Sequence, residues 1–234
     1  MDATEKHVMN HLMHRGCTNV VYEPDGNVPP DFLVDGSIAI EVRRLNQHHF
    51  DGADTKGLEE VAIPLWHRVK KLITELGPPI GGESWFIFLR FKRPMESWRT
   101  LEPRIQKGLQ SFMQSATKQK GSVVKGKGFE LDVFRASKQH ATMFVMGGCR
   151  DRDSGGWVVS EMETNIRYCA SVKSRKIANV RSKYGHWWLA LVDHIGQGLD
   201  SFEREAFRNQ VSIEHSWDKI LIIDPSDHTR WFEI

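Results

Sequence analysis

Asp31, Glu41 and Arg43 are the residues whose types and spacing most clearly suggest chemistry, and they lie within one short segment. Two apolar runs flank Asp35-Gly36 there, which predicts a β-hairpin. Side chains two positions apart in a strand point to the same face, so Glu41 and Arg43 share one face of the second strand.

The length of the hairpin loop decides whether Asp31 joins that face. Five apolar residues must occupy the opposite face, and these are Phe32, Val34, Ile38, Ile40 and Val42. A two-residue turn would place Asp31 opposite Ile40, on the apolar face, because a shift of one residue reverses every side chain. We therefore predict a three-residue or bulged loop around 35–37. Asp31 and Glu41 would then lie opposite or diagonal, with Cβ atoms roughly 5–8 Å apart.

Two carboxylates at this separation repel each other, and a bound divalent cation would remove the conflict. Mg²⁺ and Mn²⁺ prefer such oxygen ligands and complete their shell with water. Arg43 beside them could orient a water or stabilise developing phosphate charge. The alternative is a solvated hairpin face on which the acids pair with arginine.

The segment Pro30-Asp31, nine further residues and then Glu41-Val42-Arg43 resembles the motif of the PD-(D/E)xK nuclease superfamily, which has the restriction-endonuclease-like fold. The predicted order of helix, strand, hairpin, helix and strand over about 3–92 is also similar. The resemblance implies a metal-dependent nuclease that hydrolyses nucleic acid, DNA before RNA, in restriction, repair or mobile-element defence. Asp31 and Glu41 would bind Mg²⁺ or Mn²⁺, with the Val42 carbonyl as a third ligand.

An acidic residue on the first helix often completes such sites in this superfamily. Glu5 is the matching residue, because it shares a helix face with Met9 and Leu12. Glu23 is a second candidate. By itself, an acidic residue near a helix N-terminus is favoured by the helix dipole.

Arg43 stands where the superfamily has a lysine. Arginine does not act as a base, but it can stabilise phosphate charge. The lysine of the superfamily sometimes migrates to a neighbouring helix, and Lys70 and Lys71 in the predicted helix 57–76 could supply it. The alternative is a catalytically inactive nuclease-like module that binds nucleic acid or serves as a scaffold.

Two further segments are rich in lysine. The predicted helix 164–182 carries Lys173 on its apolar stripe and Lys176 near it. These lysines could contact the phosphate backbone of nucleic acid, or one of them could reach the acidic site. A solvated helix whose lysine stems cover apolar surface is the alternative. This helix and the apolar strand 186–192 are also similar to the late helix–strand pair of compact superfamily members.

The segment 116–128 is predicted to be a flexible basic loop, and its glycines would let lysines contact phosphates without reading sequence. A solvated mobile loop is equally consistent with it. The lysines concerned are Lys118, Lys120, Lys125 and Lys127. Other candidates are His48 or His49 as a metal ligand or general base, and Trp85, Trp98 and Trp157 as platforms for bases.

The pattern of elements predicts an α/β protein with a mixed central sheet flanked by helices. We expect a single domain, 1–234, with a nuclease-like core over about 3–92 and a C-terminal helix–strand elaboration over 129–234. Predicted helices cover 3–14, 57–76, 98–115, 164–182 and 201–209. Predicted strands cover 19–22, the hairpin 31–44, 84–91, 129–135, 141–147, 156–160, 186–192, 218–223 and 229–233.

Composition excludes several classes of protein. The 234 residues are 40% hydrophobic and 26% charged, with a net charge of +2, which is ordinary for a globular chain. No apolar run reaches the ~18 residues of a membrane span, and no secretory signal begins the chain, so we expect a cytoplasmic protein. The three cysteines form no CxxC pair, and no phosphate-binding loop, dinucleotide motif or nucleophile elbow is present. Any sequence specificity would come from a partner or from a homodimer.

Overall fold

The computed structural model describes residues 1–51 and 54–234. Contacts within the chain divide it into two compact units, one formed by 1–48 with 156–234 and the other by 49–155. This division differs from the single domain that the sequence predicts, and each unit has a hydrophobic core of its own.

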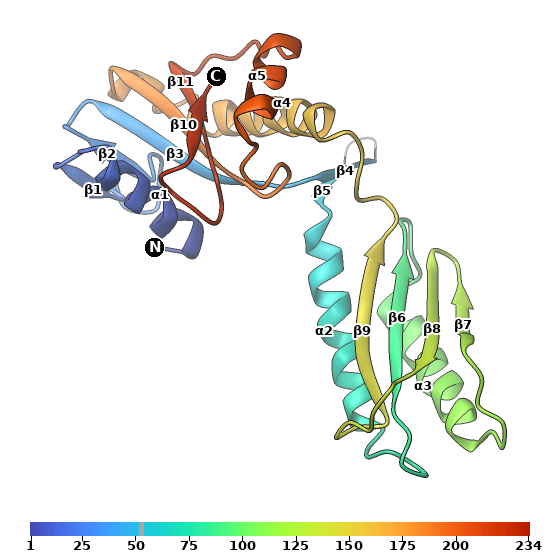
Figure 1. Cartoon of the computed structure of the whole chain (residues 1–234). Helices are drawn as coiled ribbons and strands as arrows, with labels where there is room; N and C mark the ends of the chain where they lie inside the picture. Colours follow the sequence, from blue (N-terminus) through green and yellow to red (C-terminus); the bar gives the residue numbers. More distant parts are fainter. Residues whose placement is uncertain (52–53) are drawn as a thin grey trace. The chain divides into compact units, whose positions relative to one another are not determined.

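The first unit is built on a six-stranded mixed sheet (Figure 1), in the strand order β1-β2-β3-β10-β11-β12. Strands β1, β2 and β3 form an antiparallel meander, β10 and β11 continue parallel to β3, and β12 is antiparallel to β11. The mixed sheet confirms the predicted class. Its strands are β1 Val20–Tyr22, β2 Phe32–Val34, β3 Ile38–Leu45, β10 His186–Asp193, β11 Lys219–Ile223 and β12 Trp231–Glu233.

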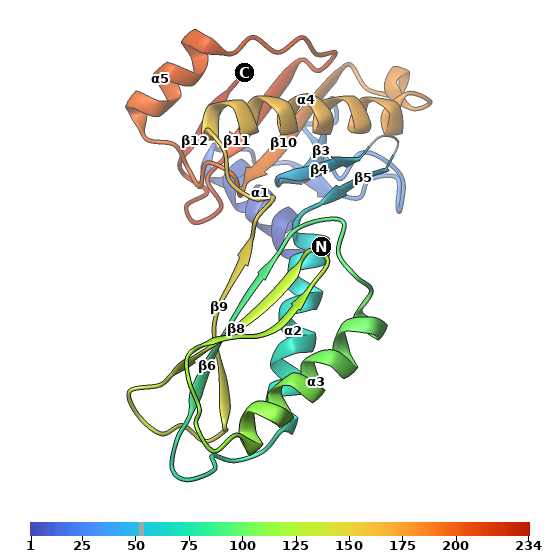
Figure 2. The same ribbon diagram turned by 90° about the vertical axis from the view of Figure 1, so that its right-hand side faces the viewer.

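Helices cover both faces of this sheet, as two views show (Figures 1 and 2). Helix α1, Ala3–His14, buries Val8 and Leu12 against one face. Helices α4, Val158–Ile177, and α5, Ser201–Gln210, contribute to the core on the other face. A short 3-10 helix, Arg181–Lys183, follows α4.

The hairpin has the predicted register. Phe32 pairs with Ile40 and Val34 pairs with Ile38, which leaves a loop of three residues, 35–37. The apolar side chains of the hairpin join the core beneath α1. Ala39, which shares its face with Glu41, joins the core that includes α4.

The second unit has a four-stranded sheet in the order β7-β8-β6-β9, in which β9 is parallel to β6 and the other pairs are antiparallel. Helices α2, Glu59–Glu75, and α3, Trp98–Gln114, share one core with this sheet. The strands are β6 Trp85–Phe91, β7 Gly121–Gly126, β8 Phe129–Arg135 and β9 Phe144–Asp151. A separate pair is formed by β4 His48–Asp51 and β5 Asp54–Gly57.

The course of the chain differs from the sequence-based prediction in three places. The predicted core 3–92 is interrupted, because β6 belongs to the second unit and β10 takes the place beside β3. The predicted loop 116–128 contains strand β7, which pairs with β8. The predicted strand 156–160 overlaps the start of α4, where Val159 is buried with Met162 and Ile166 at helical spacing.

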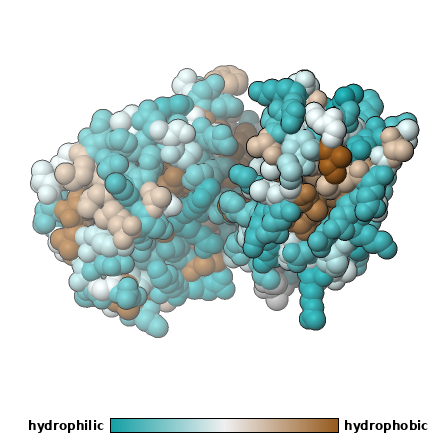
Figure 3. Space-filling model, turned by 90° about the horizontal axis from the view of Figure 1, so that it is seen from below, coloured by the Kyte–Doolittle hydropathy of each residue, from teal (hydrophilic) through white to brown (hydrophobic). Residues whose placement is uncertain are grey.

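None of the described helices is long and apolar enough to cross a membrane. The surface in Figure 3 is largely hydrophilic, and its hydrophobic residues gather in small patches.

Candidate functional site

The predicted acidic pair lies where β2 begins, opposite the middle of β3. Asp31 directly precedes β2, and the observed register places it opposite Glu41. Its Oδ2 atom accepts a hydrogen bond from the Val42 N–H at 2.6 Å. The N–H and C=O groups of one strand residue point to the same side, so the Val42 carbonyl faces this edge as well.

Helix α4 adds two lysines to this acidic pair. The Lys173 Nζ atom lies 2.7 Å from Glu41 Oε2 and 3.6 Å from Asp31 Oδ2. Lys176 follows three positions later, on the same side of the helix, with its Nζ atom 3.2 Å from the same Glu41 oxygen. Two carboxylates and two ammonium groups therefore form one cluster within the first unit.

Burial differs sharply within the cluster. The Glu41 side chain is 0% exposed and Lys173 is 13% exposed, whereas Lys176 is 48% exposed. A buried charge without partners would be costly, and the lysines offset the cost for Glu41. Glu41 Oε1 is nevertheless buried without a hydrogen-bond partner in the part of the chain that the structure describes.

The unmatched Glu41 Oε1 atom is an oxygen of the type that binds divalent cations. Mg²⁺ is commonly held by one or two carboxylates with waters, which is the number of carboxylates in this cluster. Among residues 1–51 and 54–234, no group of three or more His, Cys, Asp or Glu side chains is placed to hold a metal ion. Any cation here would therefore rely on two carboxylates, the Val42 carbonyl and water.

Glu5 and Glu23 share one hydrogen-bond partner, the hydroxyl of Tyr22. The Tyr22 hydroxyl oxygen lies 2.9 Å from Glu5 Oε2 and 3.0 Å from Glu23 Oε1, so both carboxylates accept from its single O–H. Desolvation and the two carboxylates raise the pKa of Tyr22, which keeps its hydroxyl protonated as the donor. Glu5 also caps α1 with Asp2, while the Glu23 N–H donates to the Asp31 carbonyl at 2.9 Å. Both acids thus have structural partners.

Arg43 lies beside α4 in a neighbouring polar group. One of its guanidinium nitrogens is 3.2 Å from His48 Nε2, and the guanidinium lies 5.4 Å from the centre of the Tyr168 ring. The His48 N–H donates to the buried Asn165 at 2.9 Å. The Arg43 side chain is therefore held in place by His48 and by the ring of Tyr168, both of the first unit.

The Cys169 thiol lies on α4, one turn before Lys173. Burial raises its pKa to about 11, although Arg43 and Lys173 oppose this change. The thiol is therefore protonated at neutral pH and takes part in packing rather than in nucleophilic chemistry.

The remaining candidates lie elsewhere. Lys70 and Lys71 are on α2 of the second unit, where Lys71 Nζ is 3.8 Å from Glu75, whereas the acidic pair and its lysines all belong to the first unit. Also in the second unit are Lys118, Lys120, Lys125, Lys127, His49, Trp85 and Trp98. Trp85 is buried in the core there, and Trp157 of the first unit is exposed.

The lysine that reaches the acids comes from α4, which is followed by β10. Strand β10 pairs with β3 of the hairpin, although residues 49–155 separate the hairpin from α4 in the sequence. The signal of this lysine in the sequence was the place of Lys173 on an apolar stripe, which left its role open. Comparison of the chain with protein-family models, with curated proteins and with solved structures finds no match.

Proposed function

We propose that the first unit is a metal-dependent nuclease that hydrolyses phosphodiester bonds of nucleic acid, with DNA rather than RNA as the expected substrate. One observation carries the proposal: Lys173 reaches Glu41 and Asp31 at 2.7 and 3.6 Å. This contact supplies the lysine that the sequence motif lacks at Arg43. An Asp–Glu–Lys set at the end of a hairpin is what the resemblance to the PD-(D/E)xK superfamily implies.

The order of elements in the first unit supports the same proposal. Helix α1, the antiparallel strands β1, β2 and β3, helix α4 and the parallel strand β10 follow one another once the second unit is set aside. The resemblance implies this order of helix, strand, hairpin, helix and strand. The second unit is inserted between β3 and α4.

Each residue of the cluster has a role in the proposed reaction. Asp31, Glu41 and the Val42 carbonyl would hold Mg²⁺ or Mn²⁺, which when bound supplies an activated water and positive charge. Lys173, largely buried, would stabilise negative charge that develops on the phosphate. Lys176, half exposed, would contact the phosphate backbone.

A second candidate function is a catalytically inactive module that binds nucleic acid. One observation favours it: the two ammonium groups already balance the charges of Asp31 and Glu41 without a metal. In that case the cluster is a structural ion-pair network at the edge of the hairpin, and the lysines contact phosphates only.

Cleavage assays on single- and double-stranded DNA and on RNA, with Mg²⁺, Mn²⁺ or EDTA, distinguish the two functions. We expect metal-dependent cutting by the native protein and none by Glu41→Gln, which keeps the size of the side chain but removes its charge. Calorimetry with Mn²⁺ gives a second readout, because Glu41→Gln should also weaken binding of the metal.

Glu163→Gln is the matched control, because Glu163 lies on α4 but pairs with Arg167 at 2.8 Å. This variant should cut and bind Mn²⁺ as the native protein does. Cutting by Glu41→Gln at the native rate would overturn the site. The absence of both cutting and Mn²⁺ binding in the native protein would favour the inactive module.

A further inference from the structure

The sheet of the second unit has an aromatic face that no described helix of that unit covers. Helices α2 and α3 both lie on the other face, as Figures 1 and 2 show. Phe88 on β6 and Phe134 on β8 are each 39% exposed, and their ring centres are 5.2 Å apart in an edge-to-face arrangement. Phenylalanine at such positions is unusual on a solvated face, because water favours polar side chains there.

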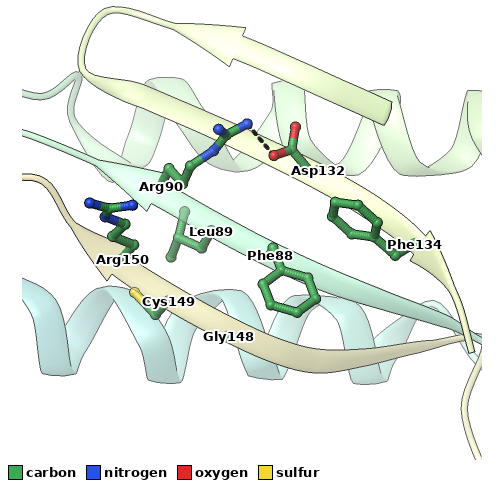
Figure 4. Close-up of a pocket in the computed structure, with 8 residues that line it drawn as sticks. All are labelled: Phe88, Leu89, Arg90, Asp132, Phe134, Gly148, Cys149 and Arg150. Carbon is green, nitrogen blue, oxygen red and sulfur yellow. Dashed lines mark hydrogen bonds and ion pairs between the residues drawn. The ribbon is translucent and has the colours of Figure 1, made fainter. Parts of the chain in front are cut away.

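Two glycines on the neighbouring strand β9 make room for the Phe88 ring. A Cβ atom on Gly147 would lie 2.7 Å from this ring, and one on Gly148 would lie 2.9 Å from it. Neither glycine has a positive φ, so the backbone does not require glycine at these positions. The space taken by the Phe88 ring does require it. The ring occupies the space of two missing side chains and presents its broad side in Figure 4. Phe88 is still 39% exposed, so part of its ring is accessible to a planar partner.

A hollow of about 450 Å³ lies over these rings, and a second of about 300 Å³ adjoins it. The two hollows share Arg90. The first is lined by Phe88, Phe134 and Arg150, together with Asp132 (Figure 4). The second is mainly basic, and its charged lining residues are Arg90, Lys92, Lys125, Arg152 and Glu130. An aromatic hollow therefore continues into a basic one.

Cations outnumber acids along this face. Glu130 forms ion pairs with Arg90 at 3.2 Å, Arg152 at 3.1 Å and Lys125 at 3.4 Å. Burial alone would raise the pKa of Glu130, but these three cations hold it below its usual value. Arg90 also pairs with Asp132.

Arg150 adds a further positive charge beside the rings. Within the described residues it has no ion-pair partner, and it lies opposite Arg90 in the sheet. The face thus combines partly exposed aromatic rings with an excess of positive charge.

From this combination we infer that the open face of the second unit binds single-stranded nucleic acid. A base stacks on Phe88 beside Phe134, because an unpaired base exposes a flat face that a duplex hides. The adjoining phosphates lie along Arg150, Arg90 and the basic hollow, where their charge matches the surplus of cations. Neither contact reads base edges, so binding tolerates many sequences.

This binding face goes beyond the proposed nuclease and does not depend on it. Its residues all belong to the second unit, whereas the acidic cluster belongs to the first. Measuring binding in EDTA keeps the two questions apart, because no metal-dependent cleavage takes place there. A failure of one proposal then leaves the other to its own test.

Fluorescence anisotropy with labelled single strands of about 20 nucleotides, as DNA and as RNA, tests the inference on the full chain. A duplex of the same length is the comparison. We expect the native protein to bind single strands more tightly than the duplex. Phe88→Ala should raise the Kd for single strands roughly 5- to 150-fold, the loss of one base stack, and change the Kd for the duplex little.

Phe88→Leu tests stacking directly, since it keeps an apolar side chain but removes the ring, and it should weaken binding as Phe88→Ala does. Phe202→Ala, a change of an exposed phenylalanine on α5, should bind like the native protein. Native affinity in Phe88→Leu, or no preference of the native protein for single strands, would overturn the inference. The DNA and RNA arms show which strand is preferred.

Arg150→Gln supplies an independent variant if Phe88 proves necessary for folding. It should lower the salt dependence of binding by about one counterion, whereas Arg99→Gln on α3 should not change it. An unchanged salt dependence in Arg150→Gln would contradict the proposed path of the phosphates.

Discussion

Glu41 is the residue on which the proposed chemistry of the first unit depends. Its carboxylate is fully buried on the sheet face that α4 covers, and two lysines of that helix meet one of its oxygens. A buried carboxylate is normally costly, and its second oxygen remains unmatched among the described residues. Stability alone does not require such a group, because an apolar side chain would fit the core with less cost. In the proposed function, the metal would be the partner of this oxygen.

The two lysines should differ in their effect on stability. Lys173→Met removes the nearer and more buried ammonium group, and should lower the free energy of unfolding by about 3 kcal/mol, since Glu41 stays buried. Lys176→Met removes a half-exposed partner and should cost less than about 1 kcal/mol. Urea denaturation followed by circular dichroism measures both. Equal losses would show that Lys173 is not the main partner of Glu41.

The sequence predicts the acidic pair from local patterns, but it gives Lys173 only as one of several lysines that could reach the pair. Asp31 and Glu41 are linked by the alternation of apolar residues and by the length of one loop, both of which are local. Lys173 lies more than a hundred positions after Glu41, and only the packing of α4 on β3 joins them. Nothing local distinguishes Lys173 from a lysine that covers apolar surface.

The hairpin depends on backbone geometry in its three-residue loop. Asp35 and Gly36 both have positive φ, at 49° and 67°, and the Ser37 N–H donates to the Val34 carbonyl at 3.2 Å. A positive φ is costly for residues with a Cβ atom and free for glycine. Gly36 therefore helps to keep Asp31 opposite Glu41.

Replacing that glycine should weaken the hairpin. Gly36→Ala should reduce the free energy of unfolding by about 1 kcal/mol, because a Cβ atom meets no neighbour within 4 Å and only the backbone resists it. Gly185→Ala is the control, since it also meets nothing and has no positive φ. Thermal or urea unfolding compares the two. A loss in Gly185→Ala as large as in Gly36→Ala would contradict the explanation.

Most helices and strands follow from local patterns, and the exceptions have physical reasons. Helix α1, strand β8 and strand β10 occur within one residue of their predicted bounds, because each has a clear periodicity. The start of α4 was predicted as a strand, since Val158 and Val159 are β-branched, a local preference that packing overrides. Strand β7 was hidden in a glycine- and lysine-rich segment, where pairing with β8 rather than composition makes a strand.

The division into two units could not be predicted from the sequence, because it depends on which helix–strand pair follows the hairpin in space. The pair α2 and β6 comes first along the chain, but β10 pairs with β3 over its whole length. The second unit closes its own core between α2, α3 and a sheet, with Ile87, Leu89 and Leu131 fully buried. It is thus an insertion with the properties of an independent domain.

The first unit should fold without the inserted unit. The two ends of the insertion are near each other in the first unit. The His48 N–H, at one end, donates to Asn165 at 2.9 Å. Asn165 is seven residues after the start of α4 at Val158, which corresponds to about 10 Å along the helix axis. A Gly-Ser linker of about six residues can span such a distance. We expect the chain in which this linker replaces 49–155 to unfold cooperatively in urea and to keep metal-dependent cleavage, because the acidic cluster and both sheet faces remain whole.

The separate fragment 49–155 completes this test. It should fold alone, as near-ultraviolet circular dichroism and a cooperative urea transition would show, and should bind single strands through Phe88 without cutting them. The shortened chain should conversely cut but lose the preference for single strands, because chemistry and strand binding belong to different cores. If the shortened chain folds but no longer cuts, the cluster of Asp31, Glu41 and Lys173 needs the second unit for activity. That outcome would make the insertion part of the enzyme rather than a separate means of holding its substrate.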